Sequence, residues 1–245
     1  MNQNERDLEM TRFPHKTGYV YRLRVSRSGS LAYVGHLDLM RTFERAFRRS
    51  GLCLLHSQGY NPRPIMVFAL PLGVGIESVR DYLDVSFVLN LAVQDILSAV
   101  RPYLPPDLSI ISGWQTQENN GSIMALVSAA TYRLEAPGIV CAVKSLLKKE
   151  EIIVQKKSKG QMRSLDIRPL ILDAIAKDPI KEDDITVVVL AGSHENLRPD
   201  LLLSALVEYA RYSQELAANC RVIRTGLFAG VYPNLKTFEE LDELC

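Results

Sequence analysis

The hydrophobic pattern of residues 19–89 changes from a period of two to a period of three to four, and then returns to two. The opening YVYRLRVSR alternates apolar and polar side chains, as a half-buried strand does. A helix is expected to begin near Gly35–His36 and to end at Gly51, a residue that suits a helix C-terminus. After Gly51 a strand is expected, followed by the extended, stiff NPRP motif and the run IMVFALPLGVGI, before a strand at Asp81–Leu89. This order predicts a β-α-β-β unit.

The rest of the chain continues the alternation of strands and helices. A helix over Val93–Tyr103 and a strand over Leu108–Trp114 complete the first unit as β-α-β-β-α-β. The second half repeats the theme more loosely, with DIRP extended before Pro169 and helical after it. Its predicted elements are Ala130–Ala136, Ile139–Lys149, Glu151–Lys157, Asp166–Ile175, Asp184–Ala191, Leu197–Leu216 and Arg221–Phe228. We predict an α+β fold of two tandem ferredoxin-like (βαββαβ) lobes with antiparallel sheets. Helices would cover one face of the first sheet and leave the opposite face open for binding.

The polar stretch QTQENNGS is typical of a linker between the two lobes. The predicted divisions are an N-terminal extension at 1–17, a lobe with an arginine-rich helix at 18–116, a linker at 117–128, a second lobe at 129–230 and an acidic C-terminal tail at 231–245. The FEELDEL segment of that tail can form an amphipathic helix that binds a partner. A solvated terminus is the simpler interpretation.

Composition narrows the classes of protein that remain. With 47% hydrophobic residues, 245 residues can bury an ample core. No apolar run approaches the roughly 20 residues of a membrane span, and MNQNERDLEM does not resemble a signal peptide, so a cytoplasmic location is expected. The four cysteines, Cys53, Cys141, Cys220 and Cys245, lack the spacing of metal ligands. We therefore expect no metal, no iron–sulfur cluster and no other cofactor on this chain.

Charge is distributed very unevenly along the chain. Between Arg22 and Arg63 there are eight arginines, no lysine and only two acids, Asp38 and Glu44, although the whole chain has a net charge of +1. Such a local surplus predicts a surface for an anion, with phosphate as the expected group. Guanidinium groups favour this interpretation because they can contact phosphate bidentately. The plainer alternative is a row of solvated arginines.

The predicted nucleic-acid interface joins three parts of the sequence. The first is a basic ridge on the predicted helix, the second is the polar face of the first strand, and the third is the YNPRP loop, where Tyr60 can stack on a base. The turn KKSKGQMR would extend the basic track into the second lobe. The predicted interface residues are Arg22, Arg24, Arg41, Arg45, Arg48, Arg49, His56, Gln58, Tyr60, Asn61, Arg63, Lys156, Lys157, Lys159 and Arg163.

His36 stands at the start of the arginine-rich helix, next to the predicted anion surface. A general acid or base at this position could serve RNA cleavage. A histidine that caps or hydrogen-bonds at a helix start is the more common situation. No catalytic residue follows from the sequence unless the protein is a nuclease.

The segments HLDLMR, ERAFRRSGL, SQGYNPRP, PLGVGIES and YLDV resemble the signature of the radical-SAM-linked protein family, a bacterial domain of unknown function. DIRP and RVIRTGLF extend the resemblance more weakly into the second half. Gly35 stands where serine is expected, which removes a side-chain N-cap. The resemblance implies a link to a separate radical SAM protein, which would carry the iron–sulfur cluster and SAM. Through members joined to an RNase G-type ribonuclease, it also implies a connection to RNA.

Three functions follow as hypotheses. The first is a non-catalytic RNA-binding module that presents tRNA or rRNA to a radical SAM partner. The second is a metal-independent endoribonuclease that uses His36, by analogy of fold with enzymes that process CRISPR repeats. The third is a protein adaptor whose arginines bind an acidic patch of the radical SAM protein. We favour the first, because the arginine bias suits phosphate.

Overall fold

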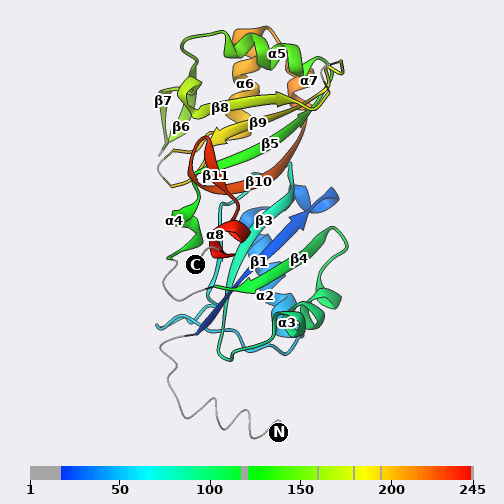
Figure 1. Ribbon diagram of the computed structural model, residues 1–245, viewed down its shortest axis with the longest axis vertical. Helices are drawn as coiled ribbons and strands as arrows, with labels where there is room; N and C mark the ends of the chain where they lie inside the picture. The colour runs from blue at the N-terminus through cyan, green and yellow to red at the C-terminus, as the bar shows by residue number, and fades with distance from the viewer. Residues whose placement is uncertain (1–17, 117–120, 159, 179, 194, 244–245) are drawn as a thin grey trace, which may run out of the picture.

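The computed structural model describes residues 18–116, 121–158, 160–178, 180–193 and 195–243. The predicted extension at 1–17 and part of the predicted linker therefore lie outside the described residues. The fold is a mixed α+β arrangement in which helices pack on a large, mostly antiparallel sheet. Figure 1 shows two halves stacked along the long axis, which we call the N-terminal half (residues 18–116) and the C-terminal half (residues 121–236). No helix of the described residues is long and apolar enough to cross a membrane.

The N-terminal half follows the predicted order of elements, except that the strand expected directly after Gly51 is reduced to isolated bridges at Leu54 and His56, and the second strand lies at Met66–Phe68. Its elements are β1 (Tyr19–Arg27), η1 (Gly29–Tyr33), α2 (His36–Arg49), β2 (Met66–Phe68), β3 (Ile76–Phe87), α3 (Val93–Val100), η2 (Arg101–Tyr103) and β4 (Leu108–Gln115). Period-two alternation places Leu23 of β1 and Leu83 and Val85 of β3 on the face that packs against α2 and α3, and all three are fully buried. Arg22 and Tyr82 consequently point to the opposite face of the sheet.

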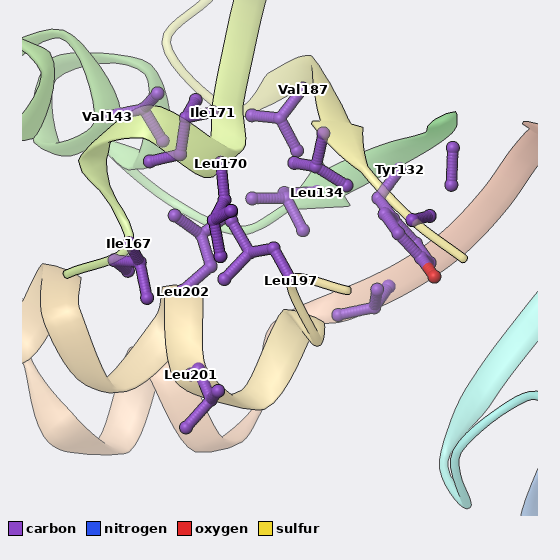
Figure 2. Close-up of a cluster of buried hydrophobic side chains, with 14 of the residues drawn as sticks. Tyr132, Leu134, Val143, Ile167, Leu170, Ile171, Val187, Leu197, Leu201 and Leu202 are labelled. Carbon is purple, nitrogen blue, oxygen red and sulfur yellow. The ribbon is translucent and has the colours of Figure 1, made fainter. Parts of the chain in front are cut away.

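The C-terminal half holds the larger of the two hydrophobic cores. Its elements are α4 (Ile123–Leu126), β5 (Ala129–Glu135), α5 (Ile139–Leu147), β6 (Ile153–Ser158), β7 (Gln161–Asp166), η3 (Arg168–Leu170), β8 (Ile171–Ala176), β9 (Asp184–Leu190), α6 (Pro199–Ala210), α7 (Gln214–Ala218), β10 (Arg221–Val231) and β11 (Asn234–Lys236). Figure 2 shows part of its core, where Leu134 and Val187 from the sheet meet Leu202 from α6. These side chains are nearly inaccessible to water, so their burial contributes strongly to the stability of this half.

One sheet runs through both halves, which corrects the prediction of separate antiparallel sheets. Its strand order is β4-β1-β3-β10-β5-β9-β8, with β2 paired to β3 and β11 paired to β10. The two halves join where β10 runs parallel to β3, with Val222 opposite Ile76 and Arg224 opposite Ser78. This join is possible because β2 is short and pairs only with Leu83–Val85 of β3. The beginning of β3 is thus left available to β10.

Two predictions in the C-terminal half are wrong. The residues after Pro169 form strand β8 rather than a helix, because β8 pairs with β9 from Ile171 to Ala176 and tertiary pairing overrides local preference. The predicted helix over residues 197–216 is divided into α6 and α7. Arg211 adopts a left-handed conformation with φ of 55°, which ends α6, and the Ser213 hydroxyl caps α7 by accepting a bond from Leu216 N.

The end of the chain returns to the N-terminal half. After β11 the chain forms α8 (Phe238–Glu243), and Figure 1 shows this red helix against β1 and β3. Thr237 and Glu240 form a capping box, in which Thr237 N donates to Glu240 Oε2 at 2.8 Å and Glu240 N donates to Thr237 Oγ1 at 3.3 Å. Phe238 is fully buried, so the interpretation of FEELDEL as a solvated terminus is wrong.

Candidate nucleic-acid interface

The eight arginines between Arg22 and Arg63 divide into two groups. Arg22 and Arg27 are buried, and Arg24 is three-quarters buried in an ion pair. The other five lie exposed on α2 and on the loop after it, and they are Arg41, Arg45, Arg48, Arg49 and Arg63. The positive surface is therefore smaller than the sequence suggests, and it is confined to the helix side of the N-terminal half.

Helix α2 positions its arginines by burying the opposite stripe. Phe43 and Phe47 are fully buried against the sheet, so residues at the intervening positions face solvent. The exposed arginines of this helix, which we call the arginine ridge, are Arg41, Arg45, Arg48 and Arg49. The last two lie in the final turn, where positive charge also favours the helix dipole. The position of the ridge thus follows from the packing of the opposite stripe of the helix.

Contacts of the ridge leave most of its hydrogen-bonding capacity available. Arg41 Nη1 pairs with Asp38 at 2.8 Å, and both side chains are 65% exposed. Arg45 Nη2 donates to Thr42 Oγ1 at 3.3 Å, and the Arg49 guanidinium lies 4.9 Å from the centroid of the Tyr103 ring. Exposed pairs of this kind contribute about 1 kcal/mol or less. A phosphate can compete with them at small cost.

The predicted YNPRP loop is a narrow, exposed projection. Its base is closed by a bridge between His56 and Pro64, and by Ser57 N donating to Arg63 O at 2.8 Å. At the tip Tyr60 is fully exposed, and Gly59 supplies the positive φ of 146° that the turn requires. Gln58, Asn61 and Arg63 are exposed as well, whereas the His56 Nδ1 atom lies 3.0 Å from Leu54 O. All of these loop residues can be reached by a ligand.

The basic turn of the C-terminal half is a β-hairpin of strands β6 and β7. Lys156 lies opposite Arg163 in this hairpin, and Arg163 is exposed. The side chain of Lys157 and the whole of Lys159 lie outside the described residues. Figure 1 shows β6 and β7 at the far end of the molecule from α2 along the long axis. The structure does not bring these basic residues into one patch with the arginine ridge.

Arg22 corrects the predicted interface. Its Nε and Nη2 atoms donate to the two carboxylate oxygens of Asp84 at 2.9 and 3.0 Å, and its Nη1 donates to Asp242 at 3.0 Å. The residue has no exposed surface, and its guanidinium lies 5.2 Å from the centroid of the Phe238 ring. Burial raises the pKa of Asp84, while the bonds from Arg22 oppose that rise. With α8 docked, the Arg22 guanidinium is fully paired inside the fold and is not accessible to an external ligand.

The sheet face expected to be open is covered by α8. Glu239 accepts bonds from Arg24 Nη1 at 3.2 Å and from the Tyr82 hydroxyl at 2.5 Å. Asp242 accepts from Trp114 Nε1 at 2.5 Å in addition to Arg22. Burial, together with the bond to Glu239, raises the pKa of Tyr82, so its hydroxyl remains a donor. Opposite charge and a buried phenylalanine explain why this short helix docks here.

Arg27 fixes the PLGVGIES loop instead of binding a ligand. Its guanidinium donates to three carbonyl oxygens, those of Ile76 at 3.2 Å, Val34 at 3.2 Å and Gly73 at 2.7 Å. The loop therefore lies against the start of α2 and the beginning of β3. Three carbonyl acceptors around one planar donor group explain why an arginine, and not a lysine, suits this position.

His36 has surroundings that suit packing more than proton transfer. Its ring contacts Phe68 edge to face, with a distance of 5.4 Å between the ring centroids. Burial and the positive charge of Arg27 lower the pKa of His36, so the ring is held neutral. A neutral ring can act as a base, but it must also reach the hydroxyl that it would deprotonate.

The C-terminal half contributes a buried arginine that the sequence reasoning missed. Arg224 in β10 donates to Asp81 Oδ1 at 2.6 Å and to Leu70 O at 2.8 Å, and only 1% of it is exposed. This bond connects the two halves beside the β3–β10 pairing. A signal was present in DYLDVSF, where two aspartates, Asp81 and Asp84, interrupt an apolar strand and require positive partners.

The acceptors on α8 were also missed as functional residues. Glu239 and Asp242 are three positions apart, as are Phe238 and Leu241, so the acidic and apolar residues fall on neighbouring parts of one helix. Together with the arginine surplus of β1, this spacing could have indicated docking inside the chain. Length alone would have argued against it, because a six-residue helix is unstable without packing.

These features define a small α+β protein with an exposed arginine ridge and an internally neutralised sheet face. The chain belongs to the family DUF2344, described as an uncharacterized protein conserved in bacteria, which it matches over residues 20–199. No curated protein matches the sequence.

Among solved structures, a chain of the "Crystal Structure of a Cbf5-Nop10-Gar1 Complex" is similar with a TM-score of 0.41 and 10% sequence identity. The alignment covers 84% of the present chain but 48% of that chain, so the present protein spans about half of its length. A likeness this distant supports no argument about fold or function.

Proposed function

We propose that this protein is an RNA-binding accessory module, and that the arginine ridge of α2 is its main contact with the RNA backbone. The observation that carries the proposal is the exposure of Arg41, Arg45, Arg48 and Arg49 on one helix face, where Asp38 is the one carboxylate of the described residues that pairs with them. A surplus of guanidinium groups in a nearly neutral chain is typical of a phosphate-binding surface.

The YNPRP loop supplies the second element of the proposed interface. Tyr60 offers an unobstructed aromatic ring for a base, while Arg63 can contact the adjoining phosphate. Arg24, Lys156 and Arg163 are secondary contacts in this proposal, and Arg22 is excluded from it. Each phosphate contact to single-stranded RNA would add a slope of about 0.7 to the dependence of log affinity on log salt.

The wider assignments rest on the resemblance to radical-SAM-linked proteins. We propose that the RNA is tRNA or rRNA, that the partner is a separate radical SAM protein with its own cluster, and that both act in the cytoplasm. We also propose that each half is a ferredoxin-like lobe. The strand orders β4-β1-β3-β2 and β10-β5-β9-β8 support this, because both place the first and third strands of a lobe in the centre.

Reversal of the arginine ridge tests the proposal. The variant Arg41→Glu/Arg45→Glu/Arg48→Glu/Arg49→Glu should lose at least about 100-fold in affinity for total tRNA and rRNA fragments in a low-salt filter-binding titration, since four phosphate contacts disappear. Its salt slope should also decrease. The matched control, Lys144→Glu/Lys148→Glu/Lys149→Glu/Lys181→Glu, changes the net charge equally on exposed positions of the C-terminal half. Equal losses in both variants, or unchanged binding by the ridge variant, would contradict the proposal.

The same titration separates the two alternative functions. A denaturing gel of the products should show intact RNA, whereas cleavage that disappears in His36→Ala would make the protein a nuclease. Absence of RNA binding at low salt, with capture of the radical SAM protein that depends on the ridge, would identify an adaptor.

A further inference from the structure

The face of β1, β3 and β4 beneath α8 presents an unusual set of groups. Two guanidinium groups, a tyrosine hydroxyl and an indole N–H all point to α8, and they come from Arg22, Arg24, Tyr82 and Trp114. Two carboxylates of α8 receive these groups: Glu239 accepts from Arg24 and Tyr82, and Asp242 accepts from Arg22 and Trp114. Phe238 fills the space between them and contacts Tyr82 edge to face at a centroid distance of 4.9 Å.

These groups are the ones that a single-stranded RNA segment would require. Arginines and aromatic N–H or O–H groups bind phosphate, and aromatic rings on a sheet stack on bases. The carboxylates of Glu239 and Asp242 occupy the positions that phosphates would take, and the Phe238 ring occupies the position of a base. An acidic helix with one aromatic ring is thus chemically similar to a short RNA segment.

Two observations indicate that this face has positive charge and hydrogen-bond donors that α8 leaves unused. The Nε atom of Arg24 is buried without a hydrogen-bond partner among the described residues, so one donor on this face is unused. Arg80 stands two residues before Tyr82 in β3, and its positive charge acts to lower the pKa of both Tyr82 and Glu240.

The contacts of α8 also allow the helix to leave the sheet and be replaced by another ligand. Arg24 and Glu239 are each 25% exposed, so this pair lies at the solvent-accessible edge. The bidentate bond of Arg22 to Asp84 does not involve α8 and would remain after the helix leaves. Because the capping box lies within the tail itself, between Thr237 and Glu240, the helix can dock and leave as one unit.

We propose that the sheet face beneath α8 is a second binding site for single-stranded RNA, and that α8 acts as a mimic of the RNA that occupies this site until RNA displaces it. This inference rests on the proposed function, because it requires that the protein binds RNA. It adds to the arginine ridge a site on the opposite face of the same sheet. The free protein is then partly self-inhibited, since its own acidic helix competes with the ligand.

The single tryptophan of the chain makes the proposal testable in the full-length protein. Trp114 donates to Asp242, so its fluorescence reports whether α8 is docked. The probe is a fluorescein-labelled oligouridine of 12 nucleotides, titrated into the wild type and into Glu239→Gln/Asp242→Asn. The amides keep the size of the side chains and can still accept from Tyr82 and Trp114, but they weaken the ion pairs with Arg24 and Arg22.

The variant should bind oligouridine about tenfold more tightly than the wild type, which is comparable to the contribution of one stacked base. Saturating unlabelled oligouridine should change the Trp114 emission in both proteins. A control, Glu208→Gln/Glu215→Gln, makes the same change in net charge at exposed positions of α6 and α7. An affinity gain no larger than that of the control, or binding without a change in Trp114 emission, would overturn this inference while leaving the arginine ridge intact. No RNA binding in any of these proteins would overturn both proposals.

Discussion

The arginines of β1 and those of α2 lie within the same short stretch of sequence but have opposite environments. Arg22 and Arg27 are buried and bonded to a carboxylate pair and to three carbonyls, respectively. Arg45 and Arg48, on α2, are exposed to solvent. The same side chain therefore stabilises the fold in the strand and forms the candidate ligand surface on the helix.

The difference follows from the neighbours that each element provides. Strand β1 lies between β3 and β4, so its polar side chains meet side chains of paired strands, and Asp84 lies directly opposite Arg22 in the register. Helix α2 buries only one stripe and leaves the rest of its circumference to water. A count of arginines in the sequence accordingly overestimates the positive surface. Buried charges must be paired, and a paired guanidinium is not available to a ligand while its partner is in place.

Substitution of Arg22 should have the largest effect on stability. In Arg22→Met, the carboxylates of Asp84 and Asp242 lose the guanidinium that balances their charge, and the free energy of unfolding should decrease by about 3–5 kcal/mol. The matched variant Arg48→Met on α2 should stay within about 0.5 kcal/mol of the wild type. Urea denaturation measures both. Equal effects of the two substitutions would show that the contrast between strand and helix arginines is not real.

Substitution of Arg27 should have an intermediate effect, because carbonyl oxygens rather than carboxylates are left without a donor. Arg27→Met should lower the free energy of unfolding by about 2–3 kcal/mol. Arg27→Lys should recover only part of this loss, since one ammonium group cannot reach three carbonyls in the geometry of the planar guanidinium. Hydrogen exchange should localise the damage to residues 73–76. Unchanged exchange in that loop would contradict the role assigned to Arg27.

The smallest expected effect concerns His36. Its burial and the nearby positive charge of Arg27 lower the pKa of its ring from the ordinary value of 6.5. Because the unfolded chain binds the proton more readily, the contribution of neutral His36 is complete above pH 6.5 and is lost as the pH falls through the lowered value. The free energy of unfolding of the wild type should therefore fall more steeply below pH 6.5 than that of His36→Gln. Parallel pH profiles in urea denaturation would show that the surroundings of His36 do not affect its protonation.

Local patterns predicted much of the N-terminal half. The alternation of β1 and the apolar stripe of α2 fixed both elements, because each pattern has a single period over many residues. The same reasoning was wrong at β8, where six residues are too few for a clear period and pairing with β9 determines the conformation. The parallel join of β3 and β10 was also missed, since it depends on how far β2 extends along β3.

The candidate interface shows the same limits. Exposure of Tyr60 and of the arginine ridge could be expected, because a loop with glycine and prolines and the polar stripe of a helix both face water. The burial of Arg22 could not be expected from the sequence, because its partners Asp84 and Asp242 are 62 and 220 positions away along the chain.

The sequence by itself determined where arginines occur, which of them share a helix face and which residues alternate along the first strand. Those properties depend on the fixed geometry of one helix or one strand. Only the tertiary structure decided which arginines are neutralised, that one sheet joins both halves, and that α8 covers the expected open face. These depend on contacts between residues far apart in the chain, which local periodicity does not encode.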